Sequence, residues 1–427
     1  MNKLMAACAA ALISSYFVPT SVLAFGGAHS GIVRTFAGER ATRTCVLMAD
    51  ARIACTTVSS FDESFVPLDV AGKDVTKVAI SESFGCALTA DSRVFCWGDN
   101  SYGRLGTDSS HDEPEPVQLF GADFDNVVDI AVGDHHPCAI RMDGTAWCWG
   151  SNVDGQLGNY KLGIGSSTNI PTQVILHDGM DTPLVNLKTI SAGDGITCAL
   201  FTDNSGSCWG YDKEGELANG KMGYSLPGPL WYRYDSPQTI FVLGRSGLER
   251  FIMGGGVISI GSSHGCSLVL DTPDKSIGCW GYNLYGQLGT GNTRDQSSAY
   301  SAMDERGKIT DAISVSSGSY FTCALVVDGT VRCWGYNGNL QIGSPAVAKG
   351  DYQENGTPVV DETGTKRLDK VIEIAAGEYG VCARRRLSGS AVDQIVCWGH
   401  DFSTGTDRAP STRFVDAPLF TDNFDGN

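Results

Sequence analysis

The sequence predicts an all-β protein built as a ring of small antiparallel sheets, and three observations lead to this prediction. A unit with two cysteines, a turn and a Trp-Gly recurs along the chain, as in "CAIRMDGTAWCWGSNVDGQLG" from Cys138 to Gly158. Six clear copies and one worn copy are present. Helical periodicity is absent, whereas short apolar strands and turn residues alternate throughout. Because so small a unit cannot bury its own apolar face, we expect radial repetition, which leaves only short, protected strand edges.

The first 24 residues have the features of a secretory signal peptide. Lys3 provides a positive start, a mostly apolar stretch follows, and Val22-Leu23-Ala24 is a plausible cleavage site before Phe25. A lipoprotein signal through Cys8 is disfavoured because the apolar stretch before it is too short. No later run of 18 apolar residues follows, so no membrane span is expected. We therefore expect a secreted, periplasmic or cell-surface protein with a bacterial type of signal.

The composition limits the classes of partner. The chain has 427 residues, of which 42% are hydrophobic, and its net charge is −17. This is enough chain for a large core or for several domains. The negative charge argues against sequence-independent binding to nucleic acid or to anionic membranes. We interpret it as a charge that keeps an exported protein soluble.

The cysteines predict disulfides rather than a metal site. Beyond Cys8 there are fourteen, and an even number in an exported chain indicates disulfide bonds. Zinc sites usually need cysteines two to four residues apart, and no C-x-x-C occurs here, so we expect no metal site and no cofactor. The predicted pairs are Cys45 with Cys55, Cys86 with Cys96, Cys138 with Cys148, Cys198 with Cys208, Cys266 with Cys279, Cys323 with Cys333, and Cys382 with Cys397.

The ten-residue spacing of five of these pairs suits a disulfide within one β-hairpin. If Met142-Asp143-Gly144 forms a three-residue loop, Arg141 faces Thr145 and Cys138 faces Cys148. Such loops favour glycine at their left-handed position. Directly opposed cysteines have nearly the Cα separation that a disulfide needs.

Two other repeated features are interpreted as structural. A tryptophan follows the second cysteine in six units, and we expect it to fill the space between adjacent sheets. The sequence G-x-L-G, as in Gly155 to Gly158, predicts a tight turn whose leucine enters the core. The first unit has Thr56-Thr57 in place of Trp-Gly, and the last lacks G-x-L-G. In a closed ring, the two ends could complete each other's sheets.

Taken together, these residues resemble the RCC1 repeat, named for the regulator of chromosome condensation. The shared pattern is "DG-x-x-x-CWG-x-N-x-x-GQLG", preceded by "A-x-G-x-x-[HF]", and it covers roughly residues 30–420. The resemblance implies a seven-bladed β-propeller, which we place at residues 25–420. The cysteine spacing puts one disulfide in each blade, and we expect residues 421–427 to be a disordered tail. Relatives of this kind include a nuclear exchange factor for a small GTPase, a plant light sensor and a secreted bacterial inhibitor of β-lactamases. What they share is protein binding through one face of the ring.

Two regions differ between the units and are therefore candidate binding sites. One is the loop before each first cysteine, in which we select His136, Phe321 and Tyr379. Aromatic side chains at such a rim would suit a protein partner, although they could equally stabilise their own turns. The other is the long insertion between Cys208 and Cys266, which contains Trp231, Tyr232, Arg233 and Tyr234. These residue types dominate interface hot spots, but they could also fold back onto their own blade.

No catalytic signature accompanies these regions. The chain lacks H-E-x-x-H and a P-loop, and no residue matches a catalytic role of the resembled family. We expect an exported, non-catalytic and monomeric scaffold that binds a protein, such as an inhibitor or an effector. The alternatives are an exchange-type regulator of a small GTPase and a surface or glycan-binding module. Disulfides count against the regulator, because a cytosol would reduce them.

Overall fold

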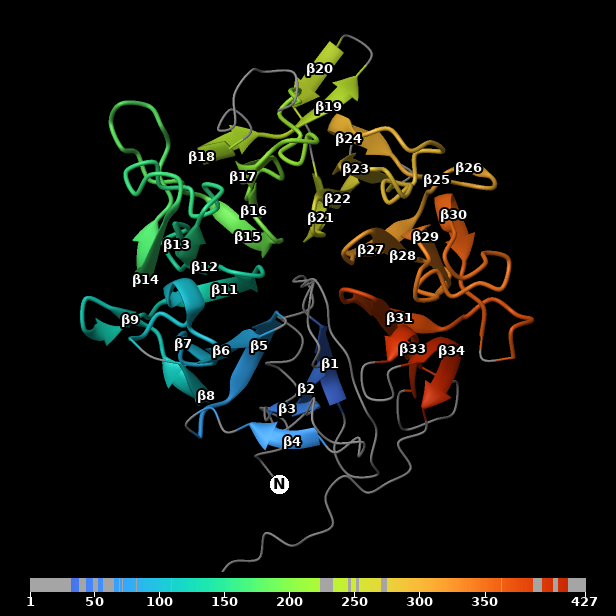
Figure 1. Ribbon diagram of the computed structural model, residues 1–427, viewed down its shortest axis with the longest axis horizontal. Coiled ribbons are helices and arrows are strands. Elements are labelled where there is room, and N and C mark those ends of the chain that lie inside the picture. The colour runs from blue at the N-terminus through green and yellow to red at the C-terminus, as the bar shows by residue number, and fades with distance from the viewer. Residues whose placement is uncertain are drawn as a thin grey trace, which may run out of the picture.

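The strands form a ring of seven sheets, or blades, around a central axis (Figure 1). This computed structural model describes residues 32–37, 44–48, 53–56, 65–68, 70, 72–81, 83–108, 110–222, 233–244, 247–250, 253–269, 275–361, 363–386, 394–401 and 406–413. Side chains are described from residue 70 onward, apart from some at the edges of these ranges. The predicted signal peptide and the predicted tail at 421–427 lie outside the described residues.

The first four blades follow the chain in order. Blade 1 is β1 (Ile32–Ala37), β2 (Thr44–Met48), β3 (Ile53–Thr56) and β4 (Phe65–Leu68). Blade 2 is β5 (Val75–Ile80), β6 (Phe84–Thr89), β7 (Val94–Gly98) and β8 (His111–Pro116). Blade 3 is β11 (Val127–Val132), β12 (Pro137–Arg141), β13 (Ala146–Asn152) and β14 (Ser166–Gln173). Blade 4 is β15 (Leu187–Ala192), β16 (Ile196–Phe201), β17 (Gly206–Tyr211) and β18 (Arg233–Thr239).

Three further blades complete the ring. Blade 5 is β21 (Met253–Ile260), β22 (His264–Val269), β23 (Ile277–Gly281) and β24 (Gln296–Ser301). Blade 6 is β27 (Ala312–Ser317), β28 (Phe321–Val326), β29 (Val331–Tyr336) and β30 (Tyr352–Pro358). Blade 7 is β31 (Val371–Ala376), β32 (Gly380–Arg385), β33 (Gln394–Asp401) and β34 (Thr406–Arg413).

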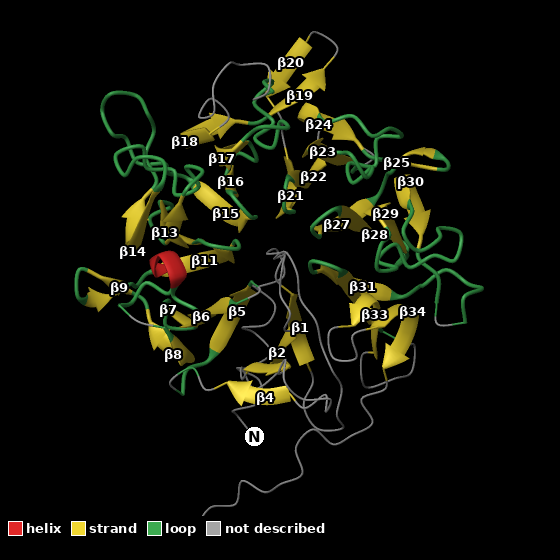
Figure 2. Ribbon diagram, in the orientation of Figure 1, coloured by secondary structure: helices red, strands yellow, loops and turns green. Residues whose placement is uncertain are grey.

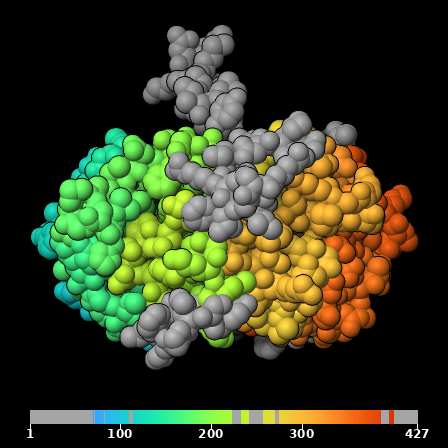
Figure 3. All heavy atoms as spheres, turned by 90° about the horizontal axis from the view of Figure 1, so that it is seen from above, coloured from blue at the N-terminus to red at the C-terminus, as the bar shows by residue number. Residues whose placement is uncertain are grey.

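Short hairpins extend the outer side of the ring. They are β9 (Gln118–Leu119) with β10 (Ala122–Asp123), β19 (Phe241–Gly244) with β20 (Gly247–Arg250), and β25 (Met303–Asp304) with β26 (Gly307–Lys308). Figure 2 shows that strands and loops make up nearly all of the drawn chain. The one helix in the described part is the three-residue 3-10 turn η1 (Ser101–Gly103), and no described helix could cross a membrane. Figure 3 shows the blades edge-on, following one another in chain order.

The predicted disulfides are confirmed in blades 2 to 7. In each of these blades the two cysteines lie opposite each other on the second and third strands and are bonded, with Cα atoms 4.0–4.1 Å apart. In blade order, the bonds join Cys86 with Cys96, Cys138 with Cys148, Cys198 with Cys208, Cys266 with Cys279, Cys323 with Cys333, and Cys382 with Cys397. Cys45 and Cys55 are also opposed in register, but their side chains lie outside the described residues.

The hairpin loop of blade 3 is also as predicted. Arg141 N donates to Thr145 O at 2.9 Å, which closes the loop from Met142 to Gly144. Gly144 has φ +78°, the left-handed conformation that such a loop needs at this position. The loop therefore sets the register in which Cys138 faces Cys148.

In blades 3 to 7 the repeated tryptophan joins the blade to the one before it. Trp149, Trp209, Trp280 and Trp334 have no exposed surface. Each indole N–H, like that of Trp398, donates to a backbone carbonyl in the turn after Trp-Gly of the preceding blade at 2.8–3.0 Å. The acceptors are Arg104, Gln156, Glu216, Gln287 and Gln341. The expectation that these tryptophans fill the space between sheets is therefore confirmed.

The last glycine of G-x-L-G is needed where the indole packs. Gly158 has φ +64°, and a Cβ there would lie 2.8 Å from Nε1 of Trp209. The preceding Leu157 is fully buried in the same cluster as Trp209, as the sequence predicted. Turn and tryptophan therefore form one interlocking contact between adjacent blades.

The ring closes where both worn units meet. Blade 1, which has Thr56-Thr57 in place of Trp-Gly, lies beside blade 7, which lacks G-x-L-G (Figure 1). The tryptophan missing from blade 1 and the G-x-L-G turn missing from blade 7 would have met at this one junction. The expectation that the chain ends complete each other's sheets is wrong, because each terminal blade takes all four strands from its own end. Each end of the chain supplies the two cysteine-bearing strands and the strand on either side of them, so neither terminal blade needs a strand from the other end.

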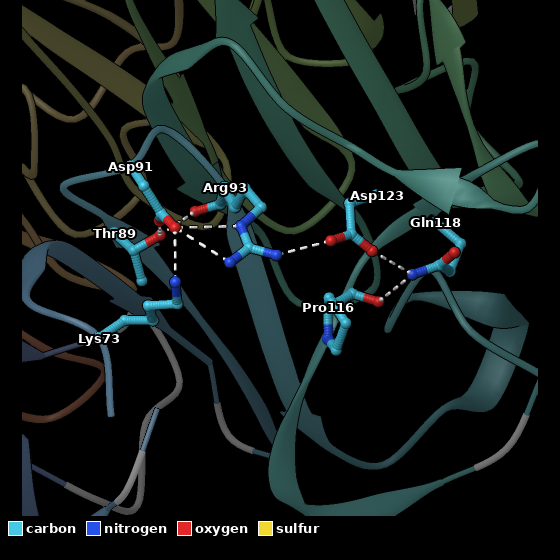
Figure 4. Close-up of polar contacts among 7 residues, drawn as sticks. All are labelled: Lys73, Thr89, Asp91, Arg93, Pro116, Gln118 and Asp123. Carbon is cyan, nitrogen blue, oxygen red and sulfur yellow. Dashed lines mark hydrogen bonds and ion pairs between the residues drawn. The ribbon is translucent and has the colours of Figure 1, made fainter. Parts of the chain in front are cut away.

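A charged network on blade 2 ties its hairpin turn to the neighbouring β9–β10 hairpin (Figure 4). Asp91 pairs with Lys73 at 2.9 Å, and Arg93 joins Asp91 to Asp123 at 3.0 and 2.6 Å. The hydrogen bond from Thr89, followed by the one from Lys73, holds the pKa of Asp91 well below its usual range. All four ionic groups are partly exposed, so the network fixes positions more than it adds stability.

We expect Trp209→Ala to lower the free energy of unfolding by about 3–5 kcal/mol, because it leaves a cavity between blades 3 and 4. Chemical denaturation of the oxidised protein measures this change. Trp147→Ala removes a half-buried tryptophan two residues before Trp149 and should cost less than half as much. Equal losses in the two variants would contradict the proposed role of the inter-blade indole.

Candidate functional site

In the blades whose loops are described, two loops meet at the same face of the ring. The first, the rim loop, enters the second strand. The second follows the Trp-Gly at the end of the third strand. Because the second and third strands are antiparallel, with Phe321 opposite Gly335 in blade 6, the start of one and the end of the other lie together. The hairpin turns such as Met142 to Gly144 lie at the opposite ends of these strands. We call the face with the two loops the rim face.

Strand alternation divides each rim loop into a buried and an exposed position. The residues at the buried position are Phe84, His136, Ile196, His264 and Phe321, each at most 3% exposed. His136 and Phe321 are fully buried, which corrects their selection as partner-contacting residues. Their side chains point inward because successive residues of an extended chain face opposite ways. In these two blades the residue before each of them, His135 or Tyr320, is the one that is partly exposed.

His136 and His264 make the same buried network in blades 3 and 5. The Thr197 hydroxyl donates to Gln156 O at 2.9 Å, so it accepts from His136 Nε2 at 2.7 Å. His264 and Thr322 repeat this pattern with Gln287 O. Each imidazole is therefore neutral with its proton on Nε2. Burial lowers the pKa of both histidines to about 3, which suits a structural role.

Tyr379 is half-buried, directly precedes β32 in the rim loop of blade 7 and lines a pocket. The pocket has a volume of about 440 Å³ and spans blades 5, 6 and 7. We call it the tyrosine pocket, and its lining residues are Tyr285, Tyr320, Tyr336, Asn339, Tyr379 and His400. Of the three rim residues selected from the sequence, only Tyr379 lies at this pocket.

The tyrosine rings hold one another in place. Tyr285 lies 5.5 Å from Tyr320 at a T-shaped angle and 4.9 Å from Tyr336, measured between ring centres. Tyr282, behind the pocket, contacts Tyr285 at 6.4 Å and Tyr320 at 6.1 Å. These separations are those of favourable aromatic pairs. All of these rings are partly exposed, so the cluster presents an ordered aromatic surface.

Acidic side chains lie close to the tyrosine cluster. Burial is the main cause that raises the pKa of Tyr282 to about 12, and Tyr285, Tyr320, Asp295 and Glu214 raise it further. Asp295 accepts a hydrogen bond from Asn283 N at 2.8 Å. The carboxylate of Asp295 is therefore bonded to the same turn of blade 5 that carries Tyr282 and Tyr285.

The two described residues of the blade 4 insertion that were predicted to bind a partner, Arg233 and Tyr234, contact other parts of the propeller. Trp231 and Tyr232 lie outside the described residues. Arg233 Nε pairs with Asp154 Oδ1 at 2.8 Å, and both side chains are mostly buried. Tyr234 packs against the core cluster of blade 4, and burial raises its pKa. Arg233 and Tyr234 are thus joined to neighbouring groups, and neither lines the tyrosine pocket.

The rim of blades 2 and 3 has a different character, because it is charged. Arg104 pairs with Asp99, donates to Asp134 O at 2.9 Å and lies 5.0 Å over the Phe84 ring. His135 contacts Tyr102 with ring centres 5.6 Å apart, whereas His136 points into the core. The two adjacent histidines therefore point apart. Within the described residues, no three His, Cys, Asp or Glu groups gather as metal ligands.

Blade 4 places carboxyl groups where its neighbours have amides. In blades 3, 5 and 6 an asparagine accepts from the leucine or isoleucine N–H of the turn, and Asp212 does so in blade 4 at 3.0 Å. Glu216 takes the position held by Gln156, Gln287 and Gln341. Burial raises the pKa of Asp212 to about 7 and that of Glu216 well above its usual value. These acids are elements of the turn.

Sequence reasoning missed most of the pocket. Tyr282, Tyr285, Tyr336, Asn339 and His400 belong to the turn after Trp-Gly, which was interpreted as purely structural. A signal was available, because "CWGYN" occurs in two consecutive units and each of the next two rim loops carries a tyrosine, Tyr320 and Tyr379. To predict the pocket from this signal, one would also have to assume that the rim loops and the turns after Trp-Gly lie at the same face of the ring.

Comparison with known families identifies the repeat. Two models of the regulator of chromosome condensation (RCC1) repeat match the chain. The first matches residues 91–140, 143–200 and 279–325, and the second matches residues 75–104, 127–156 and 312–341. The matched segments contain the cysteine hairpins and Trp-Gly turns of blades 2, 3 and 6.

Two curated proteins are similar in sequence. The ultraviolet-B receptor UVR8 of Arabidopsis thaliana is 27% identical over 351 residues, which cover 82% of this chain and 69% of the receptor. The human E3 ubiquitin-protein ligase HERC2 is 33% identical over 152 residues, 35% of this chain but only 3% of the ligase.

Among solved structures, yeast RCC1 (Prp20) bound to Kap60 gives a TM-score of 0.62 at 18% identity, covering 84% of this chain and 81% of that one. Prp20p of Saccharomyces cerevisiae, described with its binding to Gsp1p and histones, gives 0.63 at 18% identity, covering 84% and 83%. These likenesses establish the propeller fold alone.

The buried histidines predict acid sensitivity. Between pH 6.5 and about 3 the unfolded chain binds a proton on each imidazole that the folded chain does not. The free energy of unfolding should therefore fall with pH across this window, by about 1.4 kcal/mol per pH unit for each histidine. We expect His136→Phe, which copies the Phe321 position, to remove one such slope. Denaturation at several pH values measures it, and an unchanged slope would disprove the assignment.

The buried carboxyl of blade 4 predicts the opposite trend. Asp212 titrates near pH 7 when folded and near 3.8 when unfolded, so its contribution is full below pH 3.8 and is lost as the pH rises through 7. We expect Asp212→Asn, which copies Asn152, to flatten this decline and to stabilise the protein at pH 8. The exposed Asp351→Asn is the control and should leave the profile unchanged. If both variants behave alike in denaturation at pH 5 and pH 8, the prediction is wrong.

Proposed function

The chain is an RCC1-like repeat protein, and we propose on this basis that it is an exported, non-catalytic propeller that binds another protein through its rim face. The observation that carries the proposal is the tyrosine pocket. Relatives in this fold serve as binding proteins, as the complex of yeast RCC1 with Kap60 illustrates. Because fold alone does not fix function, the argument rests on the pocket.

The pocket has the properties of a protein-binding hot spot. Tyrosine is among the residue types that contribute most to interface energies. Tyr285 contacts two other pocket rings, so its orientation is set before a partner arrives. An ordered aromatic surface loses little conformational entropy on binding. Its volume of about 440 Å³ suits a side chain or short loop of a partner.

Other features favour binding over catalysis. The most strongly shifted buried groups, His136, His264, Asp212 and Glu216, are all engaged in turns or between blades, and none lines the pocket. A catalytic acid or base would need to reach a substrate. The pocket offers hydroxyl, amide and imidazole groups on an aromatic wall, which is a recognition surface.

Export is supported by the covalent design of the ring. Six described blades each carry a disulfide within one hairpin. Such bonds persist in oxidising compartments, in agreement with the signal-peptide features of residues 1–24. Both features support the proposed secreted, periplasmic or cell-surface location. Dependence on disulfides also disfavours the alternative of a cytosolic exchange-type regulator.

A glycan-binding module is the second candidate. The half-exposed tyrosine rings favour it, because aromatic faces can stack on sugar rings. The two candidates differ in the partner that the same pocket would select.

Affinity capture with the oxidised protein tests the proposal. We expect a protein to be captured from the organism's extracellular medium or surroundings, and its capture to be reduced at least tenfold by Tyr320→Ala and Tyr336→Ala, which remove pocket walls. Tyr352→Ala is the matched control, since Tyr352 belongs to blade 6 and is 46% exposed but lies outside the pocket. Capture of polysaccharide and of no protein would favour the second candidate. Equal capture by all variants would move the site elsewhere.

A further inference from the structure

We propose that the tyrosine pocket receives a positively charged side chain, a lysine ammonium or an arginine guanidinium, from the protein partner. This inference rests on the proposed function and specifies the chemistry of the contact. It follows from the aromatic walls, the carboxylates behind them and the pairing of the chain's own cations.

The aromatic walls provide the first argument. Four tyrosines from three blades surround one cavity, and the faces of aromatic rings carry negative electrostatic potential. Cations are attracted to such faces when they lie within about 6 Å of the ring centre, and clusters of rings bind ammonium groups in this way. Tyr285 has Tyr320 and Tyr336 as neighbours at different angles, so the rings enclose space from several directions. The rings are inclined to one another, unlike the parallel rings of a flat surface on which a ligand would stack.

The surrounding carboxylates provide the second argument. Asp295 is close enough to act on Tyr282, whose ring contacts both Tyr285 and Tyr320. Within the described residues Asp295 forms no ion pair, and its charge is directed at the turn that carries the tyrosines. Neither lysine nor arginine lines the pocket. The chain as a whole has a net charge of −17, which would attract a basic partner from a distance.

The chain's own cations at this face provide the third argument. Arg104 is paired with Asp99, Arg233 with Asp154, and Lys213 with Glu214. Each of these pairs involves the turns of blades 2 to 4. These three cations are engaged with carboxylates, and no lysine or arginine lines the tyrosine pocket, so a cation that fills the pocket would come from another molecule.

The pocket can also complete the hydrogen bonds of such a group. An ammonium has three N–H donors and a guanidinium has five. Tyrosine hydroxyls and the amide oxygen of Asn339 are acceptors on the same wall.

The charge requirement can be tested with small probes that differ only at the end of one side chain. Nα-acetyl-lysine methylamide and Nα-acetyl-arginine methylamide are titrated against the oxidised mature chain, with the norleucine derivative as the neutral probe. Tyrosine ring resonances in NMR spectra report binding. We expect the cationic probes to bind about tenfold more tightly than norleucine. Equal affinity of the three probes, or tighter binding of norleucine, would overturn the inference.

Two variants show whether the aromatic face is responsible. Tyr285→Phe keeps the ring and should retain the preference for the cationic probes, whereas Tyr285→Leu should lose it. Phe and Leu both remove the hydroxyl, so a difference between them isolates the ring. Thermal unfolding confirms that both variants remain folded. If Tyr285→Leu retained the preference in full, the pocket would not be the cation site.

The outcomes for the pocket chemistry and for the proposed function are separable. A captured protein that depends on Tyr320, together with no preference for cationic probes, would leave the proposed function standing and reject this inference. A clear preference for cationic probes, together with no captured protein, would reject protein binding and retain the pocket chemistry. Capture of a protein whose affinity falls tenfold when one surface lysine or arginine is changed to methionine would support both.

Discussion

Each indole N–H that reaches back to the preceding blade supports the rest of this structure. A single four-stranded blade has two faces to cover and too few residues to do so alone. The contact between Trp209 and the turn at Gln156 to Gly158 covers one such face and satisfies a buried carbonyl at the same time. Repeated around the ring, it fixes the angle and distance between neighbours. Between blades 7 and 1, the sequence lacks both the tryptophan and the G-x-L-G turn of this contact, and this junction is where the first and last blades meet.

The disulfides and the indole contacts act on different scales. The bond between Cys138 and Cys148 fixes the register of one hairpin, whereas Trp149 fixes that hairpin against the preceding blade. With both constraints in place, the loops at one end of every hairpin are held at the rim face. Their residues can then vary without loss of the fold. This freedom explains how blade 2 presents an arginine and blade 6 a tyrosine cluster at related positions.

The similarity to RCC1, UVR8 and HERC2 therefore describes the scaffold more than the site. The recognition chemistry that we propose depends on residues such as Tyr285 and Tyr336, which the repeat pattern does not require. In the same way, Asp212 and Glu216 replace amides in a single turn and change its response to pH without changing its hydrogen bonds. A shared framework with variable loops lets one fold present different surfaces.

The sequence by itself determined the all-β ring, the cysteine pairs, the turn at Gly144 and the structural roles of tryptophan and leucine. These features are local or repeated, so spacing alone reports them. Part of the rim was also accessible, since Tyr379 was selected from its loop. Tertiary structure decided the rest. Burial of His136 and Phe321 depends on which way an extended chain turns its side chains, and the pocket joins Tyr285, Tyr336 and His400 from three blades. Contacts between residues far apart in sequence follow from how the blades pack, and no pattern within one repeat contains that information.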